Sequence, residues 1–185
     1  MSVSPFTWPE RQTRSHYCCT TTTVWSTTAR RTPRNARPLL ALLRRLVERG
    51  SPIGAFGLQA HLDADLTTFN PTVLHAFLDQ VGDLGLQVLV TELDVRDAAL
   101  PGDTASRDAG VAQLYAAFLA AVLPHPTVLG VLTWGLSDRY HGSACCPERA
   151  DGLPARPLVF DADLQPKPSY TAIADAFDRA PARGS

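Results

Sequence analysis

The sequence predicts an α/β fold built on parallel strands, and three observations support this fold class. Stretches with helical periodicity alternate with short aliphatic runs along most of the chain. The aliphatic runs lack polar alternation, which is typical of strands that are buried on both faces. Each run also leads into polar or aromatic side chains. Alternation of this kind favours right-handed crossovers between parallel strands, so these side chains should gather at one edge of a sheet.

Four helices are predicted from apolar stripes with helical spacing. The first should begin near Pro38 and end at Gly50, because proline suits the first helical turn and glycine the position after the last. The second follows Asn70 and Pro71, an N-cap and a proline at the first helical position, and should end at Gly85. The stripes fall at residues 39–47, 73–84, 111–122 and 170–177, and an irregular loop over 137–165 precedes the last of them.

Three buried strands are predicted, at residues 56–61, 86–95 and 128–134. Glu92 and Asp94 are two apart on the second strand and therefore share a face, as do Gln59 and His61 on the first. The third strand ends at Trp134. An unpartnered buried carboxylate costs several kcal/mol, so Glu92 at the end of a buried strand either pairs with an arginine or belongs to a functional site.

The composition predicts one domain with its own core, since 45% of the 185 residues are hydrophobic. No apolar run is long enough to span a membrane, and we expect no membrane partner. The net charge of −1 hides an asymmetry, because residues 1–49 carry nine arginines against two glutamates. These arginines are scattered and match no nucleic-acid motif, so no nucleic-acid partner is expected either.

The four cysteines form two adjacent pairs, Cys18-Cys19 and Cys145-Cys146. Neither pair has the two-residue gap of a zinc or redox motif, so no metal and no cofactor are expected. The second pair could form a loop disulfide or remain as free surface thiols. No secretory signal is visible at the N-terminus, which lacks an apolar core.

Residues 1–35 differ in character from the rest of the chain. They are rich in arginine and threonine and show neither helical nor strand periodicity. We therefore expect an irregular or disordered segment, which could be a transit peptide, a disordered tail or an aberrant product of a shifted reading frame. Residues 36–182 form the predicted domain.

Three segments together resemble glycoside hydrolase family 10, whose members are mainly endo-1,4-β-xylanases. The segments run from Gly57 to Leu62, from Val90 to Val95 and from Thr133 to Tyr140, and residues 156–170 resemble the closing segment of the family. The resemblance extends from about Arg37 to Ala180 and implies a partial (β/α)8 TIM barrel. The three predicted strands would be its sixth, seventh and eighth. It also implies a secreted or periplasmic protein.

The resemblance implies retaining hydrolysis of β-1,4-xylan or xylo-oligosaccharides. Glu92 would be the nucleophile, and His61 and Asp94 would hold it ionised through a hydrogen-bonded network. Gln59 would contact the sugar, and Trp134 would form the floor beneath the sugar next to the scissile bond. Asp138 would be a further substrate-binding residue in the cleft. These assignments suit the chemistry, because a nucleophilic carboxylate needs nearby donors and a retaining site is built on carboxyl groups.

The sequence departs from the family pattern in three respects. The family carries its general acid/base in an Asn-Glu pair at the end of the fourth strand, and this chain contains no Asn-Glu pair. A complete barrel takes at least about 200 residues. A second tryptophan, expected some eight residues after Trp134, is replaced by the neighbourhood of Gly142 and Ser143. The sequence thus predicts the C-terminal half of the catalytic domain, without its acid/base and with an open barrel edge that favours self-association.

Two functions of different classes follow from these observations. The first is a truncated xylanase-type hydrolase. The second is a catalytically inactive remnant, or a partial barrel that binds carbohydrate weakly. A nucleotide-binding α/β domain is a third reading, and it fails because no glycine-rich phosphate loop follows any predicted strand.

Overall fold

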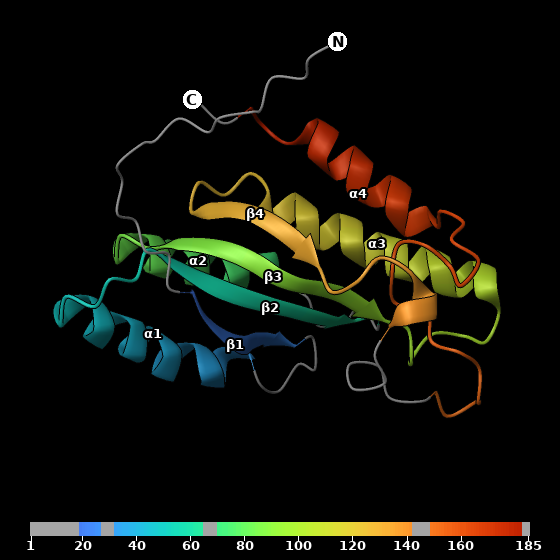
Figure 1. The fold of residues 1–185 in the computed structure, drawn as a ribbon, viewed down its shortest axis with the longest axis horizontal. Coiled ribbons are helices and arrows are strands. Elements are labelled where there is room, and N and C mark those ends of the chain that lie inside the picture. The colour runs from blue at the N-terminus through green and yellow to red at the C-terminus, as the bar shows by residue number, and fades with distance from the viewer. Residues whose placement is uncertain (1–18, 27–31, 65–69, 142–148, 183–185) are drawn as a thin grey trace, which may run out of the picture.

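The computed structural model describes residues 19–26, 32–64, 70–141 and 149–182, with side chains from residue 36 onward (Figure 1). Strands and helices alternate along these residues. The strands are β1 (Cys19–Ser26), β2 (Ala55–Asp63), β3 (Gln87–Arg96) and β4 (Val128–Thr133). The helices are α1 (Thr32–Glu48), α2 (Pro71–Asp83), α3 (Thr104–Val122) and α4 (Pro168–Arg179), and a 3-10 turn, η1 (Asp138–Tyr140), follows β4.

The strands form one parallel sheet in the order β1-β2-β3-β4. Strand order equals chain order, as in a barrel wall, and every crossover contains a helix (Figure 1). The three predicted strands are confirmed as β2, β3 and β4, adjacent in the predicted order. The fold is therefore a partial (β/α)8 barrel.

The expectation of an irregular segment over residues 1–35 is wrong for part of that range. Residues Cys19–Ser26 form β1, which pairs with β2 from Cys19↔Ala55 to Ser26↔His61. This strand lies where the resemblance places the fifth strand of the barrel. Helix α1 also begins at Thr32, a turn and a half before Pro38. Residues 1–18 lie outside the described part of the chain, so the expectation for them stays a prediction.

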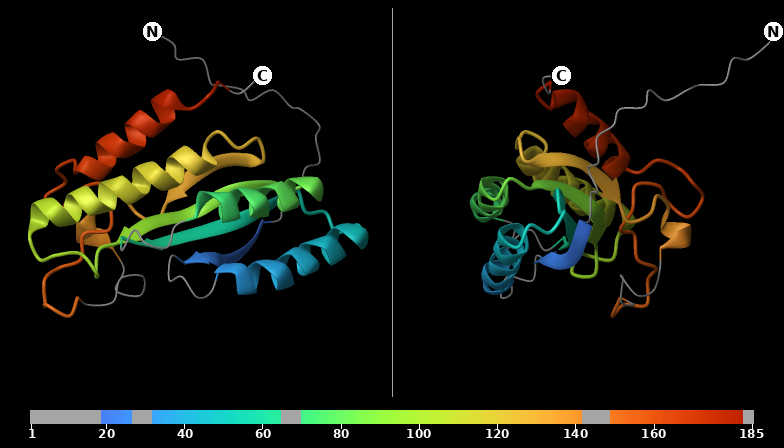
Figure 2. Two further views of the ribbon diagram at one scale, coloured as in Figure 1. Left: turned by 180° about the vertical axis from the view of Figure 1, so that it is seen from behind. Right: turned by 60° about the vertical axis from the view of Figure 1, so that its left-hand side comes forward.

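Helices α1, α2 and α3 follow one another across one face of the sheet, and α4 packs against α3 (Figure 2). The core between this helical layer and the sheet is aliphatic and aromatic. Phe56, Leu58 and Val90 of the strands and Tyr115 and Phe118 of α3 are completely buried in it. At about 25 cal/mol per Å² of apolar area, this burial is the main source of stability of the half-barrel wall.

The predicted helix boundaries at α2 are confirmed. The Asn70 side chain accepts a hydrogen bond from the Val73 amide at 3.2 Å, and Pro71 occupies the first helical position. Gly85 has a φ of +74°, a conformation that costs a residue with a Cβ more than glycine. The chain can therefore turn from α2 directly into β3.

None of the helices in the described ranges is long and apolar enough to cross a membrane. Within the same ranges, no group of three or more His, Cys, Asp or Glu side chains is arranged to hold a metal ion. Cys145, Cys146, Gly142 and Ser143 lie in the stretch 142–148, outside the described residues.

Candidate active site

The candidate site lies on β2 and β3, toward the carboxyl ends of both strands. In the register of the sheet, Gln59 is opposite Glu92 and His61 is opposite Asp94. A register shift between Leu58 and Gln59 precedes these pairs. Alternating residues of two neighbouring parallel strands thus point to the same face, which the two-residue spacing predicted.

Both carboxylate oxygens of Glu92 are held by neighbouring side chains. The Gln59 amide Nε2 donates to Glu92 Oε1 at 3.0 Å, and His61 Nε2 is 3.0 Å from Glu92 Oε2. The second ring nitrogen, His61 Nδ1, lies 3.0 Å from Asp94 Oδ1. The structure thus joins four of the predicted site residues in one continuous network: Gln59, Glu92, His61 and Asp94.

Asp94 is more deeply buried than the two side chains that follow it in the network. Its side chain is 1% exposed, whereas those of His61 and Glu92 are 19% and 15% exposed. The hydrogen bond with Asp94 raises the pKa of His61 above its ordinary 6.5, and burial opposes that shift. Burial raises the pKa of Asp94, and the hydrogen bond with His61 opposes it. Protonated His61 would donate to both carboxylates, whereas the neutral ring can donate to one of them.

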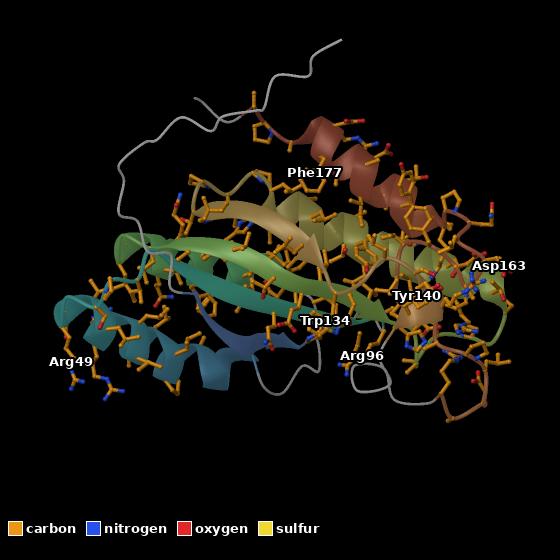
Figure 3. All side chains as sticks on the ribbon, viewed as in Figure 1. Arg49, Arg96, Trp134, Tyr140, Asp163 and Phe177 are labelled. Atoms are coloured by element: carbon orange, nitrogen blue, oxygen red, sulfur yellow. The ribbon has the colours of Figure 1, made fainter. Side chains whose placement is uncertain are left out.

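Trp134 extends this arrangement from the end of β4. Its ring centroid lies 6.0 Å from that of His61, with the planes at 86°, and the residue is 46% exposed. The Trp134 amide donates to the Leu93 carbonyl at 2.9 Å, which fixes its backbone beside β3. Figure 3 shows Trp134 and Arg96 near the carboxyl ends of the strands. An exposed indole beside a held carboxylate can stack on the apolar face of a sugar ring.

Comparison with known proteins identifies the family of this site. The sequence model of glycosyl hydrolase family 10 matches residues 22–176, which is most of the chain. The chain belongs to glycosyl hydrolase family 10. Endo-1,4-beta-xylanase 5 of Pyricularia oryzae is 32% identical over 148 residues, 80% of this chain and 35% of that protein. Endo-1,4-beta-xylanase B of Thermotoga neapolitana is 30% identical, over 74% of this chain and 38% of that protein.

Solved structures of family 10 enzymes agree with the fold. Native xylanase 10B from Thermotoga maritima superimposes with a TM-score of 0.68 at 28% identity, over 78% of this chain and 42% of that chain. Xylanase 10B from Thermotoga petrophila, in complex with xylobiose, gives the same values. The chain thus spans less than half the length of the family 10 proteins to which it is similar.

Asp138 lies in a different environment from the other predicted site residues. It is 8% exposed, and both of its carboxylate oxygens are engaged. The Leu158 amide donates to Oδ1 at 2.9 Å, and Lys167 Nζ donates to Oδ2 at 2.9 Å. This position differs from the cleft predicted for Asp138, and it assigns the residue a structural contact with the segment that leads into α4.

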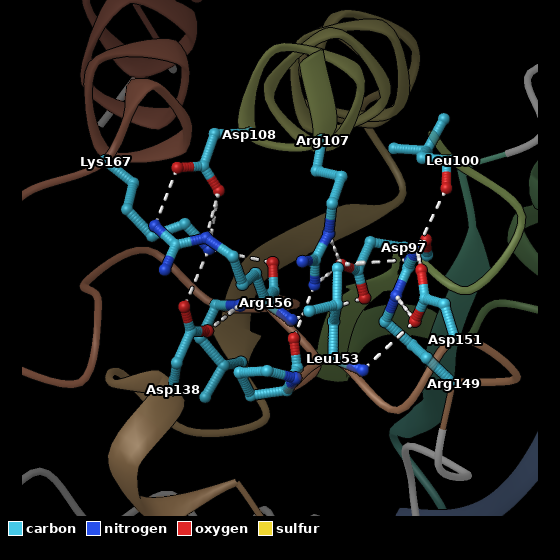
Figure 4. A network of polar contacts seen from close by, with 12 residues as sticks. Asp97, Leu100, Arg107, Asp108, Asp138, Arg149, Asp151, Leu153, Arg156 and Lys167 are labelled. Atoms are coloured by element: carbon cyan, nitrogen blue, oxygen red, sulfur yellow. Dashed lines mark hydrogen bonds and ion pairs between the residues drawn. The ribbon is translucent and has the colours of Figure 1, made fainter. Parts of the chain in front are cut away.

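Asp138 belongs to a charge network beyond the ends of β3 and β4, buried except at Asp151, which we call the loop network (Figure 4). Four acidic and four basic side chains form it, so its charges balance. The members are Asp97, Asp108, Asp138, Asp151, Arg107, Arg149, Arg156 and Lys167.

Asp97, directly after β3, is at the centre of one half of the loop network. Its Oδ2 accepts from Arg107 Nε at 2.7 Å, and its Oδ1 accepts from the Arg156 amide at 3.2 Å. Arg149 donates to the Asp97 carbonyl and, at 2.9 Å, to the Leu100 carbonyl. These contacts join the end of β3 and the first turn of α3 to the loop that precedes α4.

Asp108 and Lys167 connect the other half of the loop network. Arg156 donates to both Asp108 oxygens, at 2.8 and 2.7 Å, which is the bidentate geometry that guanidinium favours. Lys167 Nζ lies 3.4 Å from Asp108 Oδ1 and donates to Asp138 Oδ2. Burial raises the pKa of Asp138, and the charge of Lys167 opposes this shift. The segment after Trp134 is therefore anchored through Asp138 to α3 and to the start of α4.

The loop network and one further ion pair were not predicted from the sequence. Arg96 Nη2 donates to Asp63 Oδ2 at 2.7 Å, across the ends of β2 and β3. The register that pairs His61 with Asp94 also pairs Asp63 with Arg96, so strand alternation could have revealed this contact. The loop network offers no such signal, because only Arg107 and Asp108 lie on a helix and their partners lie outside the strands and helices, where no periodicity applies.

Proposed function

We propose that this chain carries the nucleophile side of a retaining β-1,4-xylan hydrolase site, with Glu92 as the nucleophile. The observation that carries the proposal is that both Glu92 oxygens are held, by Gln59 and by His61, while the side chain stays partly exposed. A carboxylate held in this way keeps a lone pair available for a ligand on the open face. Relatives named as endo-1,4-beta-xylanases and a similar structure in complex with xylobiose support the choice of substrate.

In the proposed reaction, a Glu92 oxygen attacks the anomeric carbon of a xylose unit. The bond from that carbon to the leaving oxygen breaks, and a covalent glycosyl-enzyme forms. His61 and Gln59 orient the carboxylate, Asp94 orients His61, and Trp134 supports the sugar ring from β4. Gln59 thus acts mainly through Glu92, in addition to the sugar contact that the resemblance implies.

We infer that the chain by itself lacks the general acid/base. Retaining hydrolysis needs a second carboxyl group about 5 to 5.5 Å from the nucleophile. The Asn-Glu pair that carries this group in the family does not occur in the sequence. Asp94 and Asp63, the other carboxylates on the described ends of β2 and β3, are engaged by His61 and Arg96. General acid catalysis typically contributes about 10² to 10⁴-fold, so we expect little or no hydrolysis of xylan.

An aryl xylobioside with a good leaving group tests these roles, because its departure needs no proton. We expect release of about one aryl group per chain, followed by slow turnover, and a xylobiosyl adduct on Glu92 in the mass spectrum. Glu92→Gln should abolish both the release and the adduct. Glu48→Gln, on the exposed face of α1, is the matched control and should retain them.

Two outcomes would contradict the proposal. An adduct on another carboxylate would remove Glu92 from the role of nucleophile. Rapid hydrolysis of xylan, if Glu92→Ala abolishes it, would show that another carboxylate of this chain serves as the acid.

A second candidate function is weak carbohydrate binding without catalysis. The half-exposed indole of Trp134 supports it, because such a surface binds sugar without any covalent step. Xylobiose binding that Trp134→Ala removes, together with no adduct on Glu92, would favour this function. We also propose that the open edges of the sheet allow the chain to self-associate.

A further inference from the structure

We propose that two copies of this chain associate about a twofold axis and close an eight-stranded parallel barrel, with β4 of one copy beside β1 of the other. The described part of the chain contains four consecutive strand–helix units, and all four of their strands are parallel. Eight such units close a (β/α)8 barrel. Two copies therefore supply the number of units that closure requires.

The topology defines how the two copies would meet. The two sheet edges are different strands, β1 and β4, and among the described strands each has a single neighbour. If β4 pairs with the partner's β1, all strands of the two copies can run parallel. If two like edges pair about a twofold axis, the strands at the junction run antiparallel. With four strands in each copy, two identical junctions complete the ring, so twofold symmetry leaves no edge open.

The exposed apolar side chains of β4 support a partner at this edge. Leu129 is 43% exposed and Leu132 is 51% exposed, although both lie in a strand of the sheet. Apolar edge strands are prone to pair with further strands unless something covers them. Phe177 of α4 is also 47% exposed, beside the same edge (Figure 3). At the opposite edge, Leu42 of α1 is 38% exposed, so each side of the proposed junction carries apolar surface.

The helices at the two edges carry net charges of opposite sign. Helix α1, beside β1, contains four arginines and one glutamate, whereas α4, which follows β4, contains two aspartates and one arginine. Each junction would bring α1 of one copy beside α4 of the other. Opposite charges favour this pairing over the pairing of like edges and speed association.

Closure would also complete the surroundings of the candidate site. All strands are parallel, so both Glu92 clusters would lie at the same rim of the barrel. Trp134 follows the edge strand β4 and would lie beside the end of the partner's β1. The second copy thus supplies the wall that faces the open side of each cluster.

The mass of the chain in solution tests the proposal without any substrate. We expect sedimentation at twice the chain mass of 20.0 kDa. Leu132→Lys places a charge in the junction and should raise the dissociation constant of the dimer by roughly tenfold or more. Val73→Lys is the matched control, because Val73 is 38% exposed on α2, away from both edges, and it should leave the constant unchanged.

A second variant does not depend on the folding of β4. Arg49→Glu changes an exposed position directly after α1, on the side of Leu42 by helical spacing, and circular dichroism would check that the fold is retained. We expect this variant to weaken the dimer, and rising salt to weaken the wild-type dimer. A dimer of like β4 edges would be insensitive to the α1 charges, and this result would overturn the proposal.

Three further results would overturn it. They are a monomer, a series of open oligomers, and a dimer that Leu132→Lys does not weaken. Glu92→Gln should remain dimeric, so a failure of the proposed chemistry would leave this test unaffected.

Discussion

His61 lies between two carboxylates, and this position makes the stability of the chain depend on pH. Its pKa is raised above 6.5 in the folded state, chiefly by the hydrogen bond with Asp94. A raised pKa means that the folded state holds the proton more tightly than the unfolded state. The resulting stabilisation is complete below pH 6.5 and is lost as the pH rises through the raised value.

Urea unfolding at a series of pH values measures this effect. We expect the free energy of unfolding to fall as the pH rises above 6.5, the ordinary pKa of histidine. His61→Gln removes the titrating group and should flatten the curve over this range. The pKa of Asp94 is also raised, chiefly by burial, and the hydrogen bond with His61 opposes this shift. An unchanged slope in His61→Gln would show that another group titrates.

Asp138 holds a buried lysine, so its removal should be costly. Lys167 is 3% exposed, and Asp138→Ala would leave its ammonium group without its closest carboxylate. Loss of one partner from a buried ion pair costs about 3 to 5 kcal/mol. Asp163→Ala is the control, because the pair of Asp163 with Arg139 is exposed and should contribute less than about 1 kcal/mol. Equal losses in the two variants, measured by urea unfolding, would contradict a structural role for Asp138.

The residues around Glu92 could be predicted from the sequence, whereas the contacts of Asp138 could not. Alternation along a strand places Gln59 with His61 and Glu92 with Asp94, and the parallel register then brings the pairs together. Asp138 lies in a 3-10 turn after β4, where no period fixes the direction of a side chain. Its contacts depend on where the loop before α4 folds back, which is a property of tertiary structure.

At the scale of elements, α2 depends on its N-cap. Asn70 accepts from the Val73 amide, and Asn70→Ala should lower the free energy of unfolding by about 1 kcal/mol, the typical value for loss of a cap. Asn70→Ser keeps an acceptor and should retain most of the stability. An alanine variant as stable as wild type in urea would show that another donor or acceptor replaces the cap.

Strand β1 and the first turns of α1, near the N-terminal end of the described residues, were not predicted from the sequence. β1 contains four consecutive threonines, Thr20–Thr23, which have no apolar alternation and therefore gave no strand signal. Threonine is β-branched and favours strands, so its propensity was the available indication. Helix α1 begins before Pro38, which lies inside the helix although proline removes a backbone hydrogen bond there, so this proline did not mark the helix start.

At the scale of the molecule, the alternation of helical stripes and aliphatic runs predicted a parallel α/β barrel wall, and strand order confirmed it. This alternation was sufficient to predict the parallel sheet, because each strand–helix unit packs mainly against the next unit in sequence. The number of units did not follow from the pattern, since β1 lacked a recognisable signal. The fourth strand turns the wall into half of an eight-stranded barrel.

The loop network has a consequence for the order in which the chain folds. Its pairs join residues far apart in sequence, with separations of 52 for Arg149 and Asp97 and 48 for Arg156 and Asp108. Such contacts form late, because the intervening units must first fold and the loop-closure entropy must first be overcome. Interactions absent from the transition state slow unfolding and leave folding almost unaffected. Stopped-flow measurements on Arg156→Ala should therefore show faster unfolding at an unchanged folding rate, so that the network controls how long the native state persists.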